Sequence, residues 1–148
     1  MPSAASLSQT QYYAHPQNSF WFIMESLFSA NSNLGYQQRV KLLHDNNIAV
    51  WDVLKNCKRS GSLDSAIEKN SIVTNDFNAF FNSFPSIKYV FFNGAKSQTE
   101  YSKHVTPHLI SGHQQLNYHK LPSTSPAMAS LKPIEKLEIW SIIKDSLD

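Results

Sequence analysis

Cysteine, glycine and charge are all scarce in this sequence. Its 148 residues include one cysteine, Cys57, and four glycines, and charged residues make up 16% of the chain. A single cysteine excludes an internal disulfide framework and a zinc site built on cysteine pairs. The low glycine content excludes collagen-like and glycine-rich repeats. A net charge of +2 is too small for a protein that binds nucleic acid by charge alone.

Long hydrophobic runs are also missing. No uninterrupted apolar stretch approaches the roughly 20 residues that a membrane-spanning helix requires, so we expect no membrane partner. Apolar residues nevertheless make up 41% of the chain and aromatic residues 12%, which is enough to build a buried core. Because neither an internal repeat nor a linker interrupts the chain, residues 1–148 are predicted to form a single domain. The N-terminus lacks the basic start and apolar run of a signal peptide, so we expect this domain to be soluble and cytoplasmic.

Apolar residues recur at helical spacing along much of the chain. The pattern predicts helices over residues 20–28, 37–44, 77–84, 95–104 and 133–147. Asn18 or Ser19 is placed to cap the first of these helices, and Thr74 to cap the third, which Pro85 ends. The third helix carries a stripe of phenylalanines that we expect to be core. Residues 1–18 look polar and loop-like.

Residues 87–92 are predicted to form an apolar, buried strand and residues 116–121 a second strand, and a predicted helix follows each of them. This order of strand, helix, strand and helix predicts an α/β fold with a parallel sheet. Binding crevices in such folds lie at the C-terminal ends of the strands. Asn93-Gly94 and the loop over residues 122–126 both follow a predicted strand, so they belong at that end.

Familiar catalytic signatures do not occur. The sequence has no dinucleotide-binding glycine pattern, no phosphate-binding P-loop, and no metalloprotease or serine-hydrolase motif. His104, His108 and His113 lie close in sequence, but no accompanying carboxylate or cysteine completes a ligand set, so we interpret them as loop histidines. Lysines and arginines are scattered rather than clustered. We predict neither a metal nor a cofactor.

Two segments nevertheless resemble motifs of a known enzyme superfamily. The first is MPSAASL at residues 1–7 with QYYAHPQNSFW at residues 11–21, and the second is LPSTSPA at residues 121–127. They are similar to the first and closing motifs of the uracil-DNA glycosylase superfamily. WDVL, GSLDSAI and FNG, which begin at residues 51, 61 and 92, add further matches. The pattern is most similar to the DNA-deoxyinosine (hypoxanthine-DNA) glycosylases, which are related to the mismatch-specific uracil/thymine glycosylases.

This resemblance implies a fold and an activity. The fold would be a three-layer α/β/α sandwich with a short, mainly parallel central sheet. The activity would be that of a monofunctional DNA glycosylase in base-excision repair, which hydrolyses the N-glycosidic bond of a deaminated base flipped out of double-stranded DNA, hypoxanthine first and uracil second. In a bacterium, such an enzyme would be associated with the nucleoid. A catalytically inactive DNA-binding module that keeps the fold is the alternative.

The chain departs from the superfamily pattern in two places. Relatives carry a strand and a glycine-containing turn before the Met-Pro-Ser segment, whereas this chain begins at Met1, so we expect the sheet to lack its first strand. We expect a monomer, or a dimer if a sheet edge is left exposed. Met1 also stands where the mismatch-specific relatives have a catalytic asparagine. The deoxyinosine branch lacks that asparagine too, so its chemistry must depend on other groups.

The first motif supplies the candidate catalytic and base-binding residues. By resemblance, Asn18 is the catalytic candidate, because an amide can donate a hydrogen bond to the departing base; its alternative role is a helix cap. Tyr13 would stack on the base or pack in the core. His15 would orient the loop or contact a phosphate, or make a structural hydrogen bond. The remaining candidates for substrate binding are Pro2, Ser3, Ser6 and Asn93.

The closing motif supplies the candidate DNA contacts. Ser123, Thr124 and Ser125 would bind backbone phosphates through hydroxyl and N–H groups. Met128 is placed where a side chain could wedge into the duplex, although a surface methionine would look the same in sequence.

Overall fold

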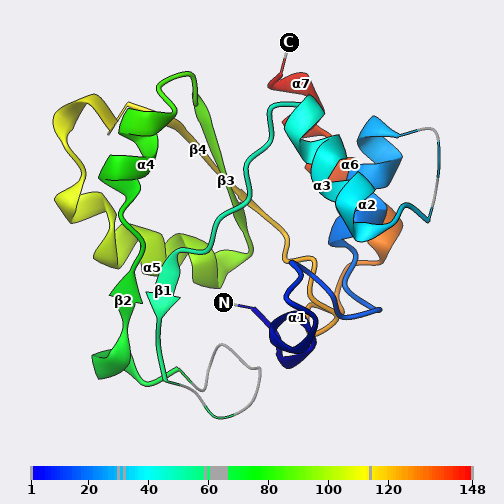
Figure 1. The fold of residues 1–148 in the computed structure, drawn as a ribbon, viewed down its shortest axis with the longest axis horizontal. Helices are drawn as coiled ribbons and strands as arrows, with labels where there is room; N and C mark the ends of the chain where they lie inside the picture. The colour runs from blue at the N-terminus through cyan, green and yellow to red at the C-terminus, as the bar shows by residue number, and fades with distance from the viewer. Residues whose placement is uncertain are drawn as a thin grey trace. The chain divides into compact units, whose positions relative to one another are not determined.

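The computed structural model describes residues 2–29, 31, 33–58, 60, 67–113 and 115–147 (Figure 1). These residues form two compact units. Unit 1 runs from Asp52 to Leu121, and unit 2 joins the flanking segments Pro2–Trp51 and Pro122–Asp148. Met1 and most of the GSLDSAI match lie outside the described residues. The prediction of a single domain stays a prediction.

Unit 1 contains the described strands, which form one antiparallel and one parallel pair. Strand β1 (Leu54–Asn56) pairs with β2 (Val73–Thr74) in the antiparallel sense. Strand β3 (Tyr89–Asn93) pairs in parallel with β4 (Asn117–Leu121), in a register that runs from Tyr89 opposite Asn117 to Asn93 opposite Leu121. Helix α5 (Ala95–His104) follows β3 and contacts both strands of the parallel pair. The mixed α/β class with a parallel sheet is confirmed.

Short helical elements complete unit 1. They are helix α4 (Phe77–Ser83) and the 3₁₀ turns η2 (Lys69–Ser71), η3 (Thr106–His108) and η4 (Ser111–His113). The prediction that Thr74 caps α4 is wrong. Thr74 lies in β2, and the Asp76 carboxylate accepts a hydrogen bond from the Ala79 N–H at 3.0 Å instead. Asp76 is the residue directly before the helix, where a capping acceptor belongs.

The core of unit 1 is largely aromatic. Its buried residues are Phe77, Phe81, Phe92, Tyr101, Val105 and Leu109. The expected phenylalanine stripe therefore belongs to the core in part, but Phe84 is 53% exposed, because α4 ends at Ser83 and the chain turns away there. After β3, Gly94 adopts φ 94°, a conformation that side-chain-bearing residues rarely take, and its N–H donates to the Leu121 carbonyl at 3.0 Å. The turn expected at Asn93-Gly94 is confirmed.

Tyr101 makes this core sensitive to alkaline pH. Its hydroxyl lies 3.4 Å from that of Tyr118, which donates to the His113 carbonyl, so Tyr101 is the donor of the pair. Burial raises the pKa of Tyr101 above its ordinary value near 10. As the pH rises, Tyr101 ionises in the unfolded chain before it ionises in the folded protein. The contribution of the neutral hydroxyl to stability is therefore fully present below about pH 10 and is lost as the pH rises further.

We therefore expect the free energy of unfolding to fall above about pH 10, and less steeply in Tyr101→Phe. At neutral pH the same substitution should cost about 0.5–1.5 kcal/mol, the usual contribution of one hydrogen bond. Urea unfolding at neutral and alkaline pH measures both effects. An equally steep alkaline loss in Tyr101→Phe would show that another group is responsible.

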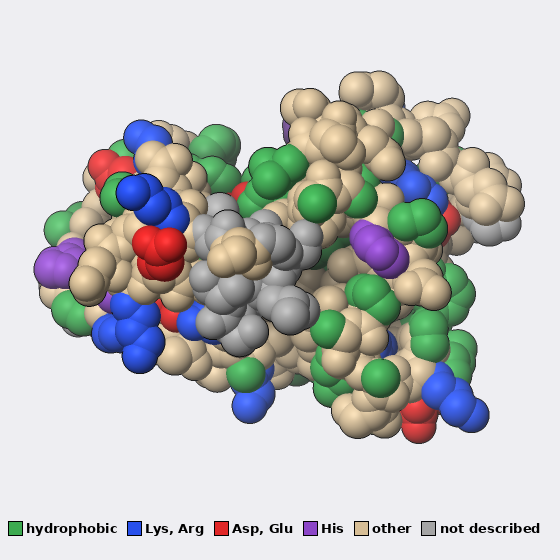
Figure 2. Space-filling model, turned by 90° about the horizontal axis from the view of Figure 1, so that it is seen from below, with side chains coloured by type: hydrophobic (Ala, Val, Ile, Leu, Met, Phe, Trp, Pro, Cys, Tyr) green, Lys and Arg blue, Asp and Glu red, His purple; other side chains and the backbone are tan. Residues whose placement is uncertain are grey.

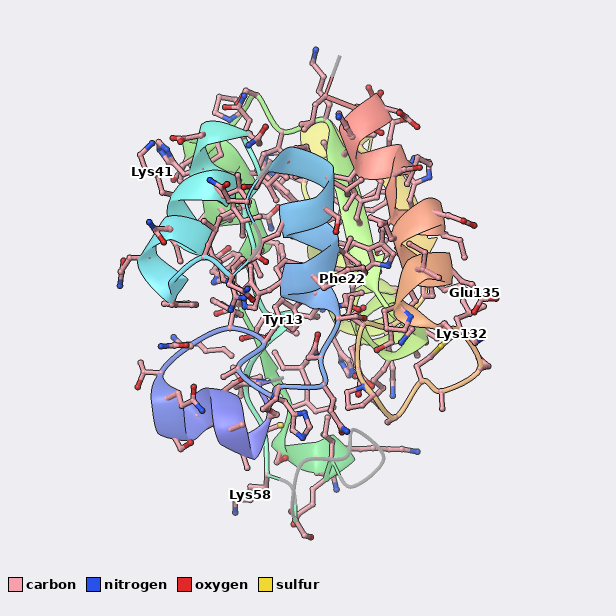
Figure 3. The ribbon with its side chains drawn as sticks, turned by 90° about the vertical axis from the view of Figure 1, so that its right-hand side faces the viewer. Tyr13, Phe22, Lys41, Lys58, Lys132 and Glu135 are labelled. Carbon is pink, nitrogen blue, oxygen red and sulfur yellow. The ribbon has the colours of Figure 1, made fainter. Side chains whose placement is uncertain are left out.

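Unit 2 is built from helices. They are α1 (Ala4–Gln9), α2 (Phe20–Phe28), α3 (Tyr36–Asp45), α6 (Pro133–Trp140) and α7 (Ile142–Asp145). Helix α2 lies between α3 and α6 and contacts both (Figure 3). Its apolar face supplies the centre of the unit, where Ile23 and Met24 are fully buried.

Two predictions for unit 2 are wrong. Residues 1–18 are not all loop, because α1 forms there without an apolar stripe. Ser3 caps it by accepting a hydrogen bond from the Ser6 N–H at 3.2 Å, while Leu7 is 62% exposed. The last helix is also interrupted. At Ser141 the hydroxyl donates to the Glu138 carbonyl at 2.7 Å, and α7 begins one residue later. Within the described part of the chain, no helix has the length and apolarity to cross a bilayer.

Candidate functional site

The two motifs singled out in the sequence meet in unit 2. The Ser19 N–H and the Ser19 hydroxyl both donate to the Thr124 carbonyl, at 3.0 and 3.2 Å. The Trp140 indole N–H donates to the Pro122 carbonyl at 2.9 Å. These bonds hold the loop over residues 122–126 against the start of α2 and the end of α6. Every predicted site residue except Asn93 belongs to this unit.

The Asn18 amide has a defined orientation at the start of α2. Its Oδ1 accepts a hydrogen bond from the Phe20 N–H at 3.0 Å. A backbone N–H can only donate, so the atom that faces it must be the oxygen, and Nδ2 points the other way. Among the described residues, Nδ2 has no hydrogen-bond partner. Ser19 is the N-cap residue of α2 and makes no side-chain capping bond, so Asn18 supplies the side-chain acceptor at the start of this helix, and its amide hydrogens stay available to a ligand.

Tyr13 lies near the N-terminal end of α2 (Figure 3). Its ring stacks on Phe20 with centroids 4.0 Å apart and planes 24° from parallel. Its backbone has φ 52°, which is unusual for a bulky residue and typical of functional loops. The stack on Phe20 agrees with the core-packing interpretation. A base would have to stack on the face turned away from Phe20, so base stacking stays a prediction.

His15, Ser3 and Ser6 organise the segment between α1 and α2. His15 Nδ1 accepts a hydrogen bond from the Gln17 N–H at 3.2 Å, so the neutral ring carries its proton on Nε2. Ser6 is buried, and its hydroxyl oxygen accepts from the Ala14 N–H at 3.2 Å and from the Ser3 hydroxyl at 3.1 Å. Ser3 and Ser6 thus position this segment; Pro2 precedes them and is half-buried. Their contacts with substrate stay predictions.

The serines of the closing loop have oriented hydroxyl groups. Ser123 Oγ accepts from the Ser125 N–H, and Ser125 Oγ accepts from the Ala127 N–H, both at 3.2 Å. Neither hydroxyl hydrogen is donated to a described residue, so both can serve an anionic ligand. The amides of Ser125 and Ala127 are already used inside the loop, whereas the hydrogens of the two hydroxyls are still available to donate.

Thr124 and Met128 have different surroundings from the two serines. Thr124 is 1% exposed, so its side chain presents no surface to DNA, and its carbonyl holds Ser19. We therefore assign it a structural role in the loop. Met128 is half-buried; its N–H donates to the Ser125 carbonyl at 3.1 Å, and its sulfur lies 3.4 Å from the Ser130 hydroxyl. Its insertion into a duplex stays a prediction.

Unit 1 contains the remaining candidates. Asn93 is the last residue of β3 and is half-buried. His104 Nε2 lies 3.3 Å from a carboxylate oxygen of the buried Glu100, a neighbour that the sequence interpretation overlooked. Even so, the described residues contain no group of three histidine, cysteine or acidic side chains arranged to hold a metal ion.

Sequence analysis missed one residue beside the closing loop. Lys136 is 3% exposed, and its Nζ donates to the Ser125 carbonyl at 3.2 Å. Burial lowers the pKa of this ammonium group. The spacing of the sequence could have indicated this burial. Lys136 lies four residues before Trp140 and seven before Ile143, on the face of the C-terminal helices that points into the unit.

Comparison with known proteins supports the resemblance. No family model matches the chain. It is 38% identical over 98 residues to a hypoxanthine DNA glycosylase of Methanosarcina barkeri and 36% identical to one of Methanosarcina acetivorans. Each match covers 66% of this chain and 61% of the relative, so the chain spans about three fifths of the curated relatives that it matches.

A solved structure extends the match over nearly the whole chain. The solution structure of a candidate uracil DNA glycosylase from Methanosarcina acetivorans superimposes with a TM-score of 0.73 at 29% identity. The superposition covers 97% of this chain and 86% of that one. The sequence motifs, the contact between them in unit 2 and the shared fold all indicate the same superfamily. The resemblance of the chain to the uracil-DNA glycosylase superfamily is confirmed.

Proposed function

We propose that the protein is a monofunctional DNA glycosylase that removes hypoxanthine, and uracil less efficiently, from double-stranded DNA. The names of its curated relatives support hypoxanthine as the first substrate. The observation that carries the proposal is the Asn18 amide, whose oxygen accepts the Phe20 N–H and whose nitrogen donates to none of the residues that the structure describes.

The chemistry needs such a donor. When the bond between the sugar C1′ and the base nitrogen breaks, the electron pair leaves with the base, and the sugar becomes oxocarbenium-like. Water then forms the new bond to C1′ and gives up a proton, while the base gains one. Hypoxanthine offers acceptors at O6 and N7, and a donor held in place before the reaction stabilises the charge that develops on them. The Phe20 N–H holds the Asn18 amide in this way, so Nδ2 needs no reorganisation.

The surrounding residues suit the binding of an extruded nucleotide. A glycosylase holds its target base outside the stack by stacking and polar contacts. Tyr13 offers an aromatic ring stacked on Phe20, and the Ser123 and Ser125 hydroxyls offer donors for backbone phosphates. On the face shown in Figure 2, the lysine and arginine side chains of the described residues are interspersed with acidic ones. With 13 basic and 11 acidic residues, affinity for undamaged duplex should be modest.

Single-turnover excision tests the proposal. The purified chain, in molar excess, is mixed with a labelled duplex that carries one hypoxanthine, one uracil or neither. Alkali then cleaves the DNA at any abasic site. We expect strand breaks only after alkali treatment, fastest with hypoxanthine, slower with uracil and none with undamaged duplex. Asn18→Asp protein purified in parallel controls for contaminating host glycosylases. Duplex binding without abasic sites would overturn the proposal and support the inactive DNA-binding module.

A further inference from the structure

We propose that Lys136 is a positioning residue for DNA binding: it lies directly behind the loop over residues 122–126 and supplies the positive charge that attracts a DNA phosphate to the Ser123 and Ser125 hydroxyls. This inference rests on the proposed function and names the group through which the closing loop would bind the DNA backbone.

The surroundings of Lys136 are unusual for a lysine. The side chain is 3% exposed, and its only hydrogen bond to a described residue is the one from Nζ to the Ser125 carbonyl. No carboxylate of the described chain lies within ion-pair distance of Nζ. Buried lysines without an acidic partner are rare, because the ammonium group loses its hydration and gains little in return.

The position on α6 adds to this cost. Lys136 is the fourth residue of the helix that begins at Pro133, near the end where the helix dipole is positive and disfavours a cation. An apolar side chain of the same length would fill this space next to Trp140 without either penalty. A buried charge that lowers stability and that the packing of the helix does not require is typical of functional sites.

The hydrogen bond itself does not explain the charge. The Ser125 carbonyl already accepts from the Met128 N–H at 3.1 Å, so it would remain satisfied without Lys136. What Lys136 alone provides is a positive charge directly behind the loop. The Ser123 and Ser125 hydroxyl oxygens are held by backbone N–H groups, which leaves their hydrogens to donate to an anion. A buried charge that water screens weakly strengthens such a site.

Lys136→Met tests the inference, because methionine keeps the length of the side chain and removes the charge. We measure the dissociation constant of a fluorescently labelled undamaged duplex and of one with a single abasic site, at several salt concentrations. Both should bind about tenfold more weakly, and the slope of log affinity against log salt should become shallower by about one. Excision at saturating protein should stay near that of the unsubstituted chain, and the melting temperature should be unchanged or higher.

Two further variants separate charge from structure. Lys136→Arg keeps the charge and should keep the salt slope. Lys144→Met removes an exposed lysine from α7 and should leave both dissociation constants near their original values. Unaltered binding and salt slope in Lys136→Met would overturn the inference, and so would weaker binding with a matching fall in melting temperature. If the unsubstituted chain binds duplex but excises nothing, the proposed function fails, while the binding measurements still decide the role of Lys136.

Discussion

Asn18→Asp is expected to lower single-turnover excision of hypoxanthine by about 10²–10³, the usual effect of losing one preorganised donor. The fold should survive, because a carboxylate oxygen can accept the Phe20 N–H bond that Oδ1 accepts now. A negative charge at the start of α2 also interacts favourably with the helix dipole. The loss of excision should come from the second atom of the group, because the substitution replaces the Nδ2 donor with a carboxylate oxygen that faces an electron-rich leaving group.

Asn18→Ala separates the two functions of the side chain. Alanine removes the capping acceptor as well as the donor, so it should cost about 1 kcal/mol of stability in addition to the loss of excision. The aspartate variant should lose excision alone. Excision is measured per folded molecule, with circular dichroism and urea unfolding on the same preparations. Near-normal excision by a well-folded Asn18→Asp protein would contradict the catalytic role and leave Asn18 as a helix cap.

Trp140→Ala is expected to cost about 3–5 kcal/mol of unfolding free energy, a large part of the 5–15 kcal/mol that holds a typical domain together. The indole is 3% exposed, and it meets the Phe20 ring edge-on at 6.0 Å. Trp140→Phe keeps an aromatic ring but leaves the Pro122 carbonyl without its donor, so about 1–3 kcal/mol should be lost.

Urea unfolding of both Trp140 variants measures these losses. Ile139→Ala is the matched control, because Ile139 belongs to the same helix and is 45% exposed; it should change stability by less than about 0.5 kcal/mol. If Trp140→Ala cost no more than this control, the link between α6 and the closing loop would contribute nothing to the stability of unit 2.

Where the sequence predicted structure well, the signal was periodic. Helices α2 and α4 form where apolar residues recur at helical spacing, and the two segments predicted as strands before Asn93 and Pro122 pair in parallel as β3 and β4. Helix α1 escaped prediction because polar capping by Ser3, rather than an apolar face, stabilises it. The misplaced cap at Thr74 has a related cause, since several polar residues precede α4 and sequence alone does not show which one turns toward it.

The site was predictable to a different degree. Resemblance identified Asn18 and the closing loop, and both lie in unit 2, joined by the bonds between Ser19 and Thr124. The hydrogen bond from the Phe20 N–H uses the amide oxygen of Asn18, so the proposed catalytic role would use the amide nitrogen, and residue type alone cannot reveal this division. Thr124 could not be told from its serine neighbours, because burial depends on contacts with residues far away in the chain.

Unit 2 is assembled from two segments that unit 1 separates in the chain. During synthesis, the stretch from Asp52 to Leu121 leaves the ribosome complete and has its own core to form around. Asn18, by contrast, is synthesised early. The loop that holds the start of its helix is synthesised much later, because the contact between Ser19 and Thr124 spans 105 residues. Contacts this distant form late in folding. The nascent protein would therefore complete the contact between Ser19 and the closing loop only after residue 124 has been synthesised.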